Sequence, residues 1–348
     1  MCREGFVFIT FCRGLQRYYL HLMFRTEIKP EPSSVKINLK DKILTAGSCF
    51  SDAIGKQLTE TKFGTLANPF GVSYNPHSIH KVLRYALHNQ VVPDHTYLSN
   101  QELAANYDFH SSFSAMKKSE VEKKIKETTG ASHYFLKDAS WVFITYGSAW
   151  VYERKDTGEI VSNCHKMPSS GFTKSLMSQK KVLESFDEFY RDLKAFNPKC
   201  KLILTVSPVR HLKDTLPLNS VSKSVLRLAC QTISETYADA FYFPSYEIML
   251  DDLRDYRFYK PDMIHPSEEA EEYIWTKFSD CFFDNNTKGF IKQWRPIRIA
   301  LQHKAFHLNS STHQNFLKKT LGQLEELSKT VNVDKEIVSV KSQIIITK

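Results

Sequence analysis

The chain of 348 residues is poor in glycine and proline, with 12 and 13 residues respectively. This scarcity excludes collagen-like and linker-dominated chains. No stretch reaches the roughly 18–20 uninterrupted apolar residues of a membrane-spanning helix, so we expect no membrane span. Hydrophobic residues make up 42% and aromatic residues 13% of the sequence, which suffices for a packed core and excludes wholesale disorder.

The seven cysteines include no Cys-x-x-Cys pair, and their number is odd. This pattern argues against a disulfide framework and against a zinc ribbon, and it favours a reducing, cytoplasmic setting. Cys164 and His165 are neighbours that suggest a metal ligand pair, but no third and fourth ligand follow at suitable spacing. We therefore expect neither a metal nor a cofactor.

Residues 1–29 are interpreted as an N-terminal extension that begins basic and contains the short apolar stretch Phe6–Phe11. No small-x-small cleavage site follows this stretch, so we expect no functional signal peptide. Met23 is an alternative start, which would make residues 1–22 an upstream extension.

The net charge of +9 is concentrated at the two ends of the chain. Residues 1–29 carry five Lys/Arg against two acidic residues, and residues 288–348 carry eleven against four, which leaves 31 basic and 32 acidic residues between them. Basic ends are more often solvated faces than ligand sites, and the chain has no finger, basic-zipper or RRM-type motif. We therefore expect no nucleic-acid partner.

Four short apolar runs, each followed by a turn residue, have the pattern of buried parallel strands: residues 42–46, 141–146, 202–206 and 240–243. Strands covered on both faces are hydrophobic almost without interruption. Helical spacing of apolar residues is found between and after them, at 52–60, 76–88, 179–196, 223–237 and 267–278. The alternation predicts a doubly wound α/β domain over residues 30–285.

Two polar segments interrupt this pattern. We expect an insertion or cap at about 89–138, with a charged helical run at 117–126, and a second loop-rich insertion at 154–172. Residues 286–348 are predicted to form a C-terminal extension with a helix at 316–327 and a weakly structured tail from residue 330.

Polar side chains follow the predicted strands at their carboxyl ends, where open α/β sheets bind ligands. Five loops should therefore meet at one rim, at 47–52, 147–150, 207–211, 246–247 and 262–265. In the last loop, Asp262 stands three residues before His265, a spacing that lets a carboxylate orient an imidazole base. In the first, Ser48 and Cys49 lie beside helix amides that can stabilise a thiolate or an oxyanion.

Each of these residues also has a structural interpretation when taken alone. His265 could cap a surface turn, Ser48 could cap the helix, and Cys49 could be a small buried side chain. A nucleophile after the first strand together with Asp-His before the last helix is much less expected by chance.

The combination resembles the SGNH/GDSL hydrolase superfamily, in which a Gly-Asp-Ser-Leu turn supplies the nucleophile and a late Asp-x-x-His supplies the base. More closely, the chain resembles the GSCFA family. The segments that carry this resemblance are Gly47–Ser51 (GSCFS), Asn68–Pro76, Gly147–Tyr152, Asn163–Lys166, Ser207–His211, Tyr242–Glu247 and Asp262–Ser267. The resemblance implies a three-layer αβα sandwich with a flavodoxin-like parallel sheet.

Alignment with the superfamily motif places Cys49 on the nucleophilic serine and Ser48 on the aspartate. A one-residue bulge would present Ser48 instead, and we favour Cys49. A thiolate beside a protonated histidine and a helix N-terminus would be activated. The resemblance then makes His265 the general base and Asp262 the residue that orients it.

The oxyanion donors depart from the superfamily, because its Gly-x-Asn-Asp turn is replaced by Gly147-Ser148-Ala149-Trp150. Asn163 and the backbone amides of Cys49 and Gly71 are the candidates to replace the missing asparagine. Arg210 and His211 are candidates to bind an anionic or acyl-carbonyl group, and an ion pair with Glu247 or Asp262 is the alternative for them. Four aromatic residues could stack on a sugar or belong to the core: Phe70, Tyr74, Trp150 and Tyr152.

By resemblance, the leading function is an ester hydrolase or O-acyl transferase that acts through an acyl-enzyme, with an acylated carbohydrate as the first substrate class to test. The alternative is a catalytically inactive SGNH-fold module that binds glycans, which the missing asparagine would explain. The sequence does not predict an oligomeric state.

Overall fold

The computed structural model describes residues 25–345 except 101 and 304. Its centre is a sheet of five parallel strands in the order β10-β9-β5-β1-β2. These strands are β1 (Lys42–Gly47), β2 (Gly64–Ala67), β5 (Trp141–Tyr146), β9 (Lys201–Val206) and β10 (Ala240–Tyr242). Renumbered along the chain, the order is 2-1-3-4-5, which is the flavodoxin-like arrangement, and the predicted fold class is confirmed. The stretch Phe6–Phe11 and the alternative start Met23 lie outside the described residues.

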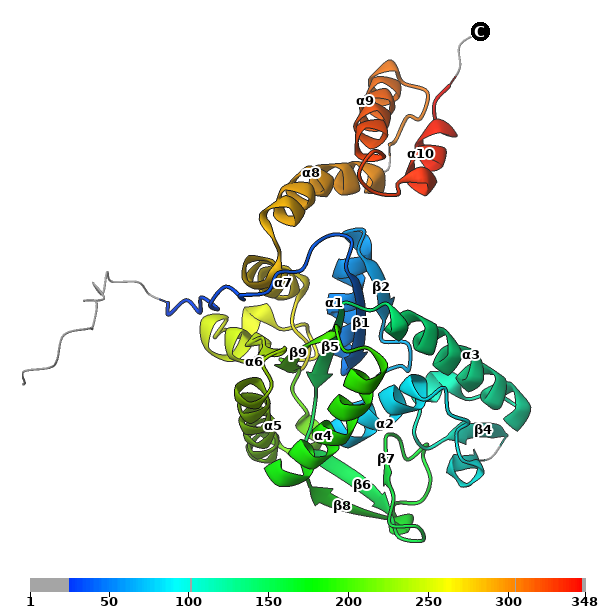
Figure 1. The fold of residues 1–348 in the computed structure, drawn as a ribbon. Helices are drawn as coiled ribbons and strands as arrows, with labels where there is room; N and C mark the ends of the chain where they lie inside the picture. Colours follow the sequence, from blue (N-terminus) through cyan, green and yellow to red (C-terminus); the bar gives the residue numbers. More distant parts are fainter. Residues whose placement is uncertain (1–24, 101, 304, 346–348) are drawn as a thin grey trace, which may run out of the picture.

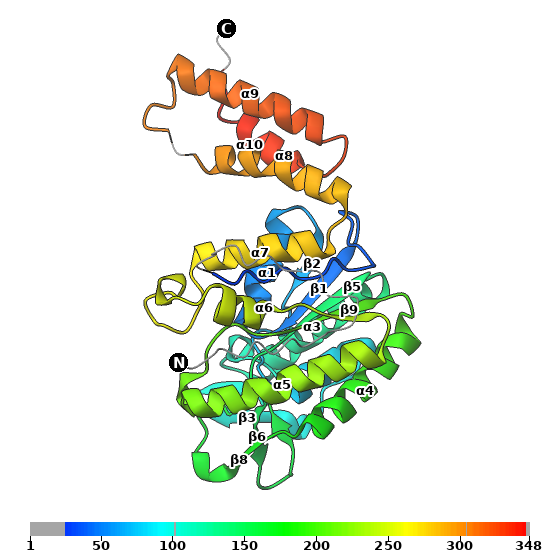
Figure 2. The same ribbon diagram turned by 90° about the vertical axis from the view of Figure 1, so that its left-hand side faces the viewer.

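Successive residues of each central strand point to opposite faces of the sheet, and both faces are covered by helices. Leu44 and Val142 pack toward α2 (Pro76–Leu87), α3 (Lys118–Lys137), α4 (Gln179–Phe196) and α5 (Leu216–Thr236). Ile43 and Phe143 pack toward α1 (Cys49–Glu60) and α7 (Glu268–Phe282). Figure 2 shows these two helical layers on either side of the strands.

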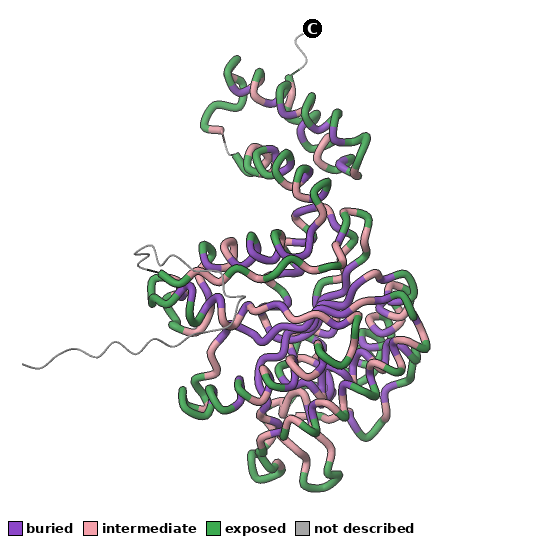
Figure 3. The backbone as a smooth tube through the Cα atoms, turned by 60° about the vertical axis from the view of Figure 1, so that its left-hand side comes forward, coloured by how far each residue is buried: buried purple, intermediate pink, exposed green. Residues whose placement is uncertain are grey.

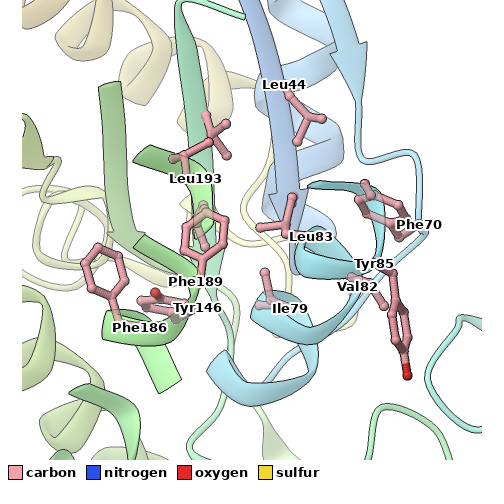
Figure 4. Packing of buried hydrophobic residues seen from close by; sticks show 14 of the residues in the cluster. Leu44, Phe70, Ile79, Val82, Leu83, Tyr85, Tyr146, Phe186, Phe189 and Leu193 are labelled. Carbon is pink, nitrogen blue, oxygen red and sulfur yellow. The ribbon is translucent and has the colours of Figure 1, made fainter. Parts of the chain in front are cut away.

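The larger of the two cores lies under α2 and α4. Ile79 and Leu83 of α2 meet Phe186 and Phe189 of α4 over the strands, as Figure 4 shows. Figure 3 shows that the inner strands of the central sheet are buried along most of their length, while the outer faces of the helices are exposed. Burial on both faces explains why the four predicted strands read as uninterrupted apolar runs.

The predicted strands and helices are present, with shifts at their ends. The edge strand β2 was not predicted, because two of its four residues are exposed, the other two are only partly buried, and it carries no continuous apolar run. Helix α1 begins at Cys49 and not at residue 52, because Ser48 caps it. Helix α5 begins seven residues before the predicted start, with Pro217 in its first turn.

The predicted insertions contain regular structure. Strands β3 (Tyr97–Asn100) and β4 (Leu103–Asn106) form a hairpin, and the charged run that follows extends into α3, which packs on α2. Strands β6 (Trp150–Arg154), β7 (Ile160–Val161) and β8 (Phe172–Leu176) form a small antiparallel sheet. A short helix, α6 (Ser245–Glu247), follows β10.

The C-terminal extension consists of α8 (Asn285–Gln302), α9 (Ser311–Leu327) and α10 (Asp334–Lys341) around a small core of its own. The predicted weakly structured tail is wrong over α10, since Val333 and Val340 are buried against this core. Trp294 Nε1 donates to the carbonyl of Glu60 at 2.7 Å and fixes α8 to the end of α1. These helices lie at the end of the domain away from β6 and β8 (Figure 1). Within the described residues, no helix has the length and apolar character needed to cross a membrane.

Candidate active site

The point where β1 ends against β5 is the centre of the site. Gly47 has a φ of +131°, and a Cβ there would lie 2.2 Å from the carbonyl oxygen of Thr145, so the approach of the two strands requires glycine. The amide of Ser48 donates to the same oxygen at 3.1 Å. The chain passes from β1 to β2 on one side and later to β5 on the other, and in this fold ligands bind where the strand order reverses.

Ser48 and Cys49 differ in their access to solvent. Ser48 is fully buried, and its Oγ accepts the amide of Phe50 at 3.4 Å as the N-cap of α1. Cys49 is the first helical residue and is partly exposed. Its own amide belongs to the first turn, whose amides have no partner within the helix. The structure therefore presents the thiol at the rim and uses the hydroxyl as a cap.

The loop after β2 is tied to this turn by Asn68. Its Oδ1 accepts the amide of Gly47 at 3.1 Å, and its Nδ2 donates to Asp52 Oδ1 at 2.9 Å. The amide of Gly71 donates to the Asn68 carbonyl at 2.9 Å, so the predicted oxyanion donor Gly71 is already bonded within its turn. Ser73 then donates its amide to the carbonyl of Gly47 at 2.9 Å.

Gly147, after β5, is the place where three site residues meet. A Cβ on Gly147 would lie 2.9 Å from Tyr74 Cδ1, 3.2 Å from Ser48 Cβ and 3.3 Å from His211 Nε2. Its amide donates to the carbonyl of Tyr74 at 2.8 Å. Glycine therefore lets the loops after β1, β2, β5 and β9 come together at one point.

His211 turns its Nε2 into this meeting point. The amide of His211 donates to Asn219 Oδ1 at 3.0 Å, and its ring packs edge-on against Tyr74 with centroids 4.9 Å apart. Nε2 is buried and has no hydrogen-bond partner among the described residues. Burial, helped by the charges of Lys223 and His265, lowers the pKa of His211 to about 3, so the imidazole is neutral at physiological pH.

Asp262 and His265 form the pair that the sequence predicts. His265 Nδ1 lies 2.7 Å from Asp262 Oδ2, while Asp262 Oδ1 accepts the amides of Ile264 and His265 at 2.9 and 3.0 Å. These bonds, the backbone amide of His265 first, lower the pKa of Asp262 to about 2. Because a carboxylate only accepts, Nδ1 carries the proton in the neutral imidazole, and Nε2 then has the lone pair. Both side chains are partly exposed.

The 262–265 turn is joined to the 207–211 loop. The amide of Arg210 donates to the carbonyl of Ile264 at 3.2 Å. His265 is also close enough that a positive charge on it contributes to the lowered pKa of His211. The guanidinium of Arg210 lies over the ring of Tyr259, 3.9 Å from its centroid. The alternative ion pair of Arg210 with Glu247 or Asp262 is not formed, because Glu247 binds Arg227 and Asp262 binds His265. Arg210 and Tyr246 line a cavity of about 250 Å³.

The electrostatics of Cys49 differ from the predicted activated thiolate. Burial is the main cause that raises the pKa of Cys49 above that of a free thiol, and the carboxylate of Asp52 adds to it. The amides of Cys49 and Phe50 and the charge of Lys223 act in the opposite direction but do not prevail. The resting group is therefore a thiol, and its reaction requires a base.

Lys223 is a site residue that sequence reasoning missed. It projects from α5, is 1% exposed, and donates from Nζ to the carbonyls of Gly147 and Ser207, each at 2.8 Å. Burial lowers its pKa to about 7. The available signal was its place on the buried stripe of α5, three residues before Leu226 and seven before Cys230.

Asn163 and its neighbours serve local structure. Asn163 Oδ1 accepts the amide of His165 at 2.8 Å, and His165 Nε2 lies 2.7 Å from the carbonyl of Asn106. Phe70 is buried in the core, whereas Tyr74 is 41% exposed beside His211. Across the described part of the chain, no three His, Cys, Asp or Glu side chains gather as a metal site would require.

Comparison with known families decides the relationship. The model of the GSCFA family matches residues 42–278, and that of the GSCFA domain protein C-terminal domain matches residues 294–346. The chain belongs to the GSCFA family. All the rim residues lie inside the first match, and α8 to α10 lie largely inside the second.

Solved structures similar to this GSCFA chain include three carbohydrate esterases. The family 3 enzyme of Talaromyces cellulolyticus is 9% identical, with a TM-score of 0.34, covering 72% of this chain and 98% of that chain. The family 2 enzyme of Corynascus thermopiles is 13% identical, with a TM-score of 0.34 and coverages of 77% and 68%. The family 3 esterase of Clostridium thermocellum is 10% identical, with a TM-score of 0.31 and coverages of 73% and 98%. No curated protein matches the chain.

Proposed function

We propose that this GSCFA protein is an ester hydrolase that forms an acyl-enzyme on Cys49, with His265 as general base and Asp262 as the residue that orients it. The observation that carries the proposal is the contact of 2.7 Å between His265 Nδ1 and Asp262 Oδ2. This contact uses Nδ1, and Nε2 of the same ring has no hydrogen-bond partner among the described residues. The turn at 262–265 is hydrogen-bonded to the loop at 207–211, which also carries His211. At Gly147, this loop comes close to the turn that contains Ser48 and Cys49.

In the proposed reaction, His265 Nε2 takes the thiol proton of Cys49 as the sulfur attacks the ester carbonyl carbon. The carbonyl π electrons move to oxygen and give a tetrahedral oxyanion. Its collapse breaks the bond to the alkoxy group, which receives the proton from His265 and leaves as an alcohol. Water, deprotonated by His265, then attacks the thioester, and collapse releases the acid and returns the proton to the Cys49 sulfur.

The oxyanion requires donors that take the place of the absent Gly-x-Asn-Asp asparagine. His211 fits this role, because it is neutral and its buried Nε2 has no other partner among the described residues. A neutral imidazole with its proton on Nε2 donates a hydrogen bond. The amide of Cys49, at the first position of α1, is a second donor in the proposal.

The substrate class that we propose is an acyl ester on a carbohydrate. Tyr74 supports it, because this ring is 41% exposed beside His211 and offers a face on which a sugar can stack. Transfer of the acyl group to a sugar hydroxyl in place of water uses the same acyl-enzyme and differs only in the second acceptor.

A second candidate is a glycan-binding module without turnover. The observation that favours it is the raised pKa of the Cys49 thiol, together with the absence of the superfamily asparagine. This candidate predicts saturable binding of an acetylated oligosaccharide that releases no acetate.

The test is acetate release and burst kinetics with p-nitrophenyl acetate, followed by peptide mass spectrometry of the trapped enzyme. We expect a burst, an acetyl group on Cys49, and loss of the burst in Cys49→Ala and His265→Ala. His88→Ala is the matched control, because His88, just after the end of α2, forms a similar pair with Asp192 at 2.8 Å. If the acetyl group is found on Ser48, or if a fluorophosphonate labels Ser48, then Ser48 is the nucleophile and the assignment of Cys49 is wrong. An unchanged burst in both variants would refute the proposal.

A further inference from the structure

Lys223 is buried without a carboxylate. It is 1% exposed, and within the described residues no acidic side chain lies within ion-pair distance of its ammonium group. Its hydrogen bonds go to two backbone carbonyls, and the ring of Tyr246 lies 5.8 Å from Nζ. An ammonium group is costly to bury in this way, and a leucine or methionine on the same stripe of α5 would avoid the cost.

The two carbonyls that hold Lys223 belong to the rim of the site. Gly147 follows β5 and contacts Ser48 and His211, and Ser207 follows β9 and begins the loop that carries His211. The ammonium group is therefore held by the two loops that meet at Gly147. Its position at the carboxyl ends of β5 and β9 is where a fixed positive charge acts on a developing anion.

We propose that Lys223 is a buried cation of the site that stabilises negative charge on the Cys49 sulfur. The role of Lys223 in catalysis rests on the proposed function. Its effect on the ionisation of the Cys49 thiol can be measured without catalytic turnover. Lys223 is a positioning residue in this scheme, because it acts on substrate through Cys49.

The groups that surround Cys49 define what Lys223 must do. Burial and, after it, Asp52 on α1 raise the pKa of the Cys49 thiol, and burial followed by the thiol raises the pKa of Tyr74. Lys223 is the cationic side chain that lowers the pKa of Cys49, and the same charge lowers the pKa of His211. One cation therefore favours the charged form of the nucleophile and the neutral form of the proposed oxyanion donor.

The effect is reciprocal. Burial lowers the pKa of Lys223, and negative charge at Cys49 raises it. Loss of the thiol proton therefore favours a fully protonated Lys223, and the two charges form together. Because the pKa of Lys223 is about 7, its charge changes within the physiological pH range. An ordinary surface lysine stays charged throughout this range.

The experiment separates the charge of Lys223 from its hydrogen bonds. Lys223→Gln keeps an N–H donor for the carbonyls and removes the charge, and Lys223→Met removes both. The rate of alkylation by iodoacetamide is measured for each cysteine as a function of pH, by peptide mass spectrometry. Cys164 is the internal control, because it is also partly exposed, while the charge that lowers its pKa belongs to Lys213.

In Lys223→Gln, we expect the half-maximal pH of Cys49 alkylation to rise, while that of Cys164 stays unchanged. An unchanged Cys49 profile in a folded Lys223→Gln protein overturns the inference, since the lysine would then only hold the two loops. Equal shifts at both cysteines also overturn it. If the burst with p-nitrophenyl acetate is absent while Cys49 alone shifts, the proposed function fails and the charge effect stands.

If neither Lys223 variant folds, the interaction between Lys223 and Cys49 is measured by changing Cys49 and keeping Lys223. Lysine side-chain ¹⁵N resonances are titrated in the wild type and in Cys49→Ala. We expect one lysine to titrate near neutral pH and its midpoint to fall when the thiol is removed. Identical titrations in the two proteins would contradict the inference.

Discussion

The imidazole of His265 and the carboxylate of Asp262 meet at 2.7 Å, in a turn that Asp262 itself holds closed by accepting two backbone amides. One carboxyl oxygen fixes the backbone and the other fixes the ring. Because Met263 between them has a φ of +57°, the turn is tight enough for both tasks. The aspartate therefore determines both the place of the histidine and its tautomer.

Replacing Asp262 with asparagine should lower kcat for an activated ester by about 10²–10⁴-fold with little change in KM, because the imidazole loses its fixed tautomer. Steady-state kinetics measure this effect. Asp255→Asn is the control, since Asp255 also caps a short turn by accepting an amide, at 2.9 Å, but holds no histidine. Equal losses in both variants would assign Asp262 a role in the turn alone.

Gly147→Ala should abolish the burst and destabilise the protein by about 1–3 kcal/mol, because the added methyl group would lie 2.9 Å from Tyr74 and 3.3 Å from His211 Nε2. Gly130→Ala is the matched control on α3, where an added Cβ meets nothing within 4 Å. The control should raise stability by about 0.5–1 kcal/mol and leave the burst intact. Thermal unfolding and burst amplitude measure the two effects, and a fully active Gly147→Ala would mean that the meeting point at this glycine is not part of the site.

His80 should make the fold sensitive to mild acid. Its ring is buried between Tyr146 and Ser185, and burial lowers its pKa to about 3. In the unfolded chain His80 binds a proton near pH 6.5, whereas in the folded protein it does so only near pH 3. The contribution of neutral His80 to the free energy of unfolding is therefore complete above pH 6.5 and is lost as the pH falls toward 3.

Between pH 7.5 and 5, the loss from His80 alone should amount to about 2 kcal/mol in the free energy of unfolding. Urea unfolding at a series of pH values measures it. His80→Gln should be less stable at pH 7.5 but should show a flatter dependence on pH over this interval. An equally steep dependence in the variant would place the acid sensitivity elsewhere.

Trp294→Phe should loosen the attachment of α8 to the end of α1. The change removes the bond of 2.7 Å from the indole to the carbonyl of Glu60, at a cost of about 1–2 kcal/mol. Trp150→Phe is the control, because its indole bond, to the carbonyl of Leu218, is long at 3.4 Å. Protection of the α8 amides in hydrogen exchange measures the effect, and equal protection in the wild type and Trp294→Phe would contradict it.

The sheet was predictable because its central strands are covered on both faces and therefore carry uninterrupted apolar runs. Strand β2 was not predicted, since this edge strand has four residues, of which two are exposed, and carries no such run. The helix at α10 escaped prediction because its burial depends on α9 and α8, which its own eight residues do not reveal.

In the site, the spacing of Asp262 and His265 was informative because their contact is local in the sequence. The sequence left open whether Ser48 or Cys49 is exposed to solvent, since this depends on which of the two side chains caps α1. The burial of Lys223 was not predicted, although it lies on the apolar stripe of α5, because lysine on a helix is ordinarily solvated and its partners are backbone carbonyls from two distant loops.

The pairing of Ile43 in β1 with Trp141 in β5 has a consequence for synthesis on the ribosome. The N-terminal strand must wait for nearly a hundred further residues before its inner neighbour exists, and closing so long a loop slows folding. The histidine turn at 262–265 emerges later still. A nascent chain thus acquires the thiol of Cys49 long before the imidazole of His265. If the proposed mechanism holds, a shorter product that stops before this turn has no activity.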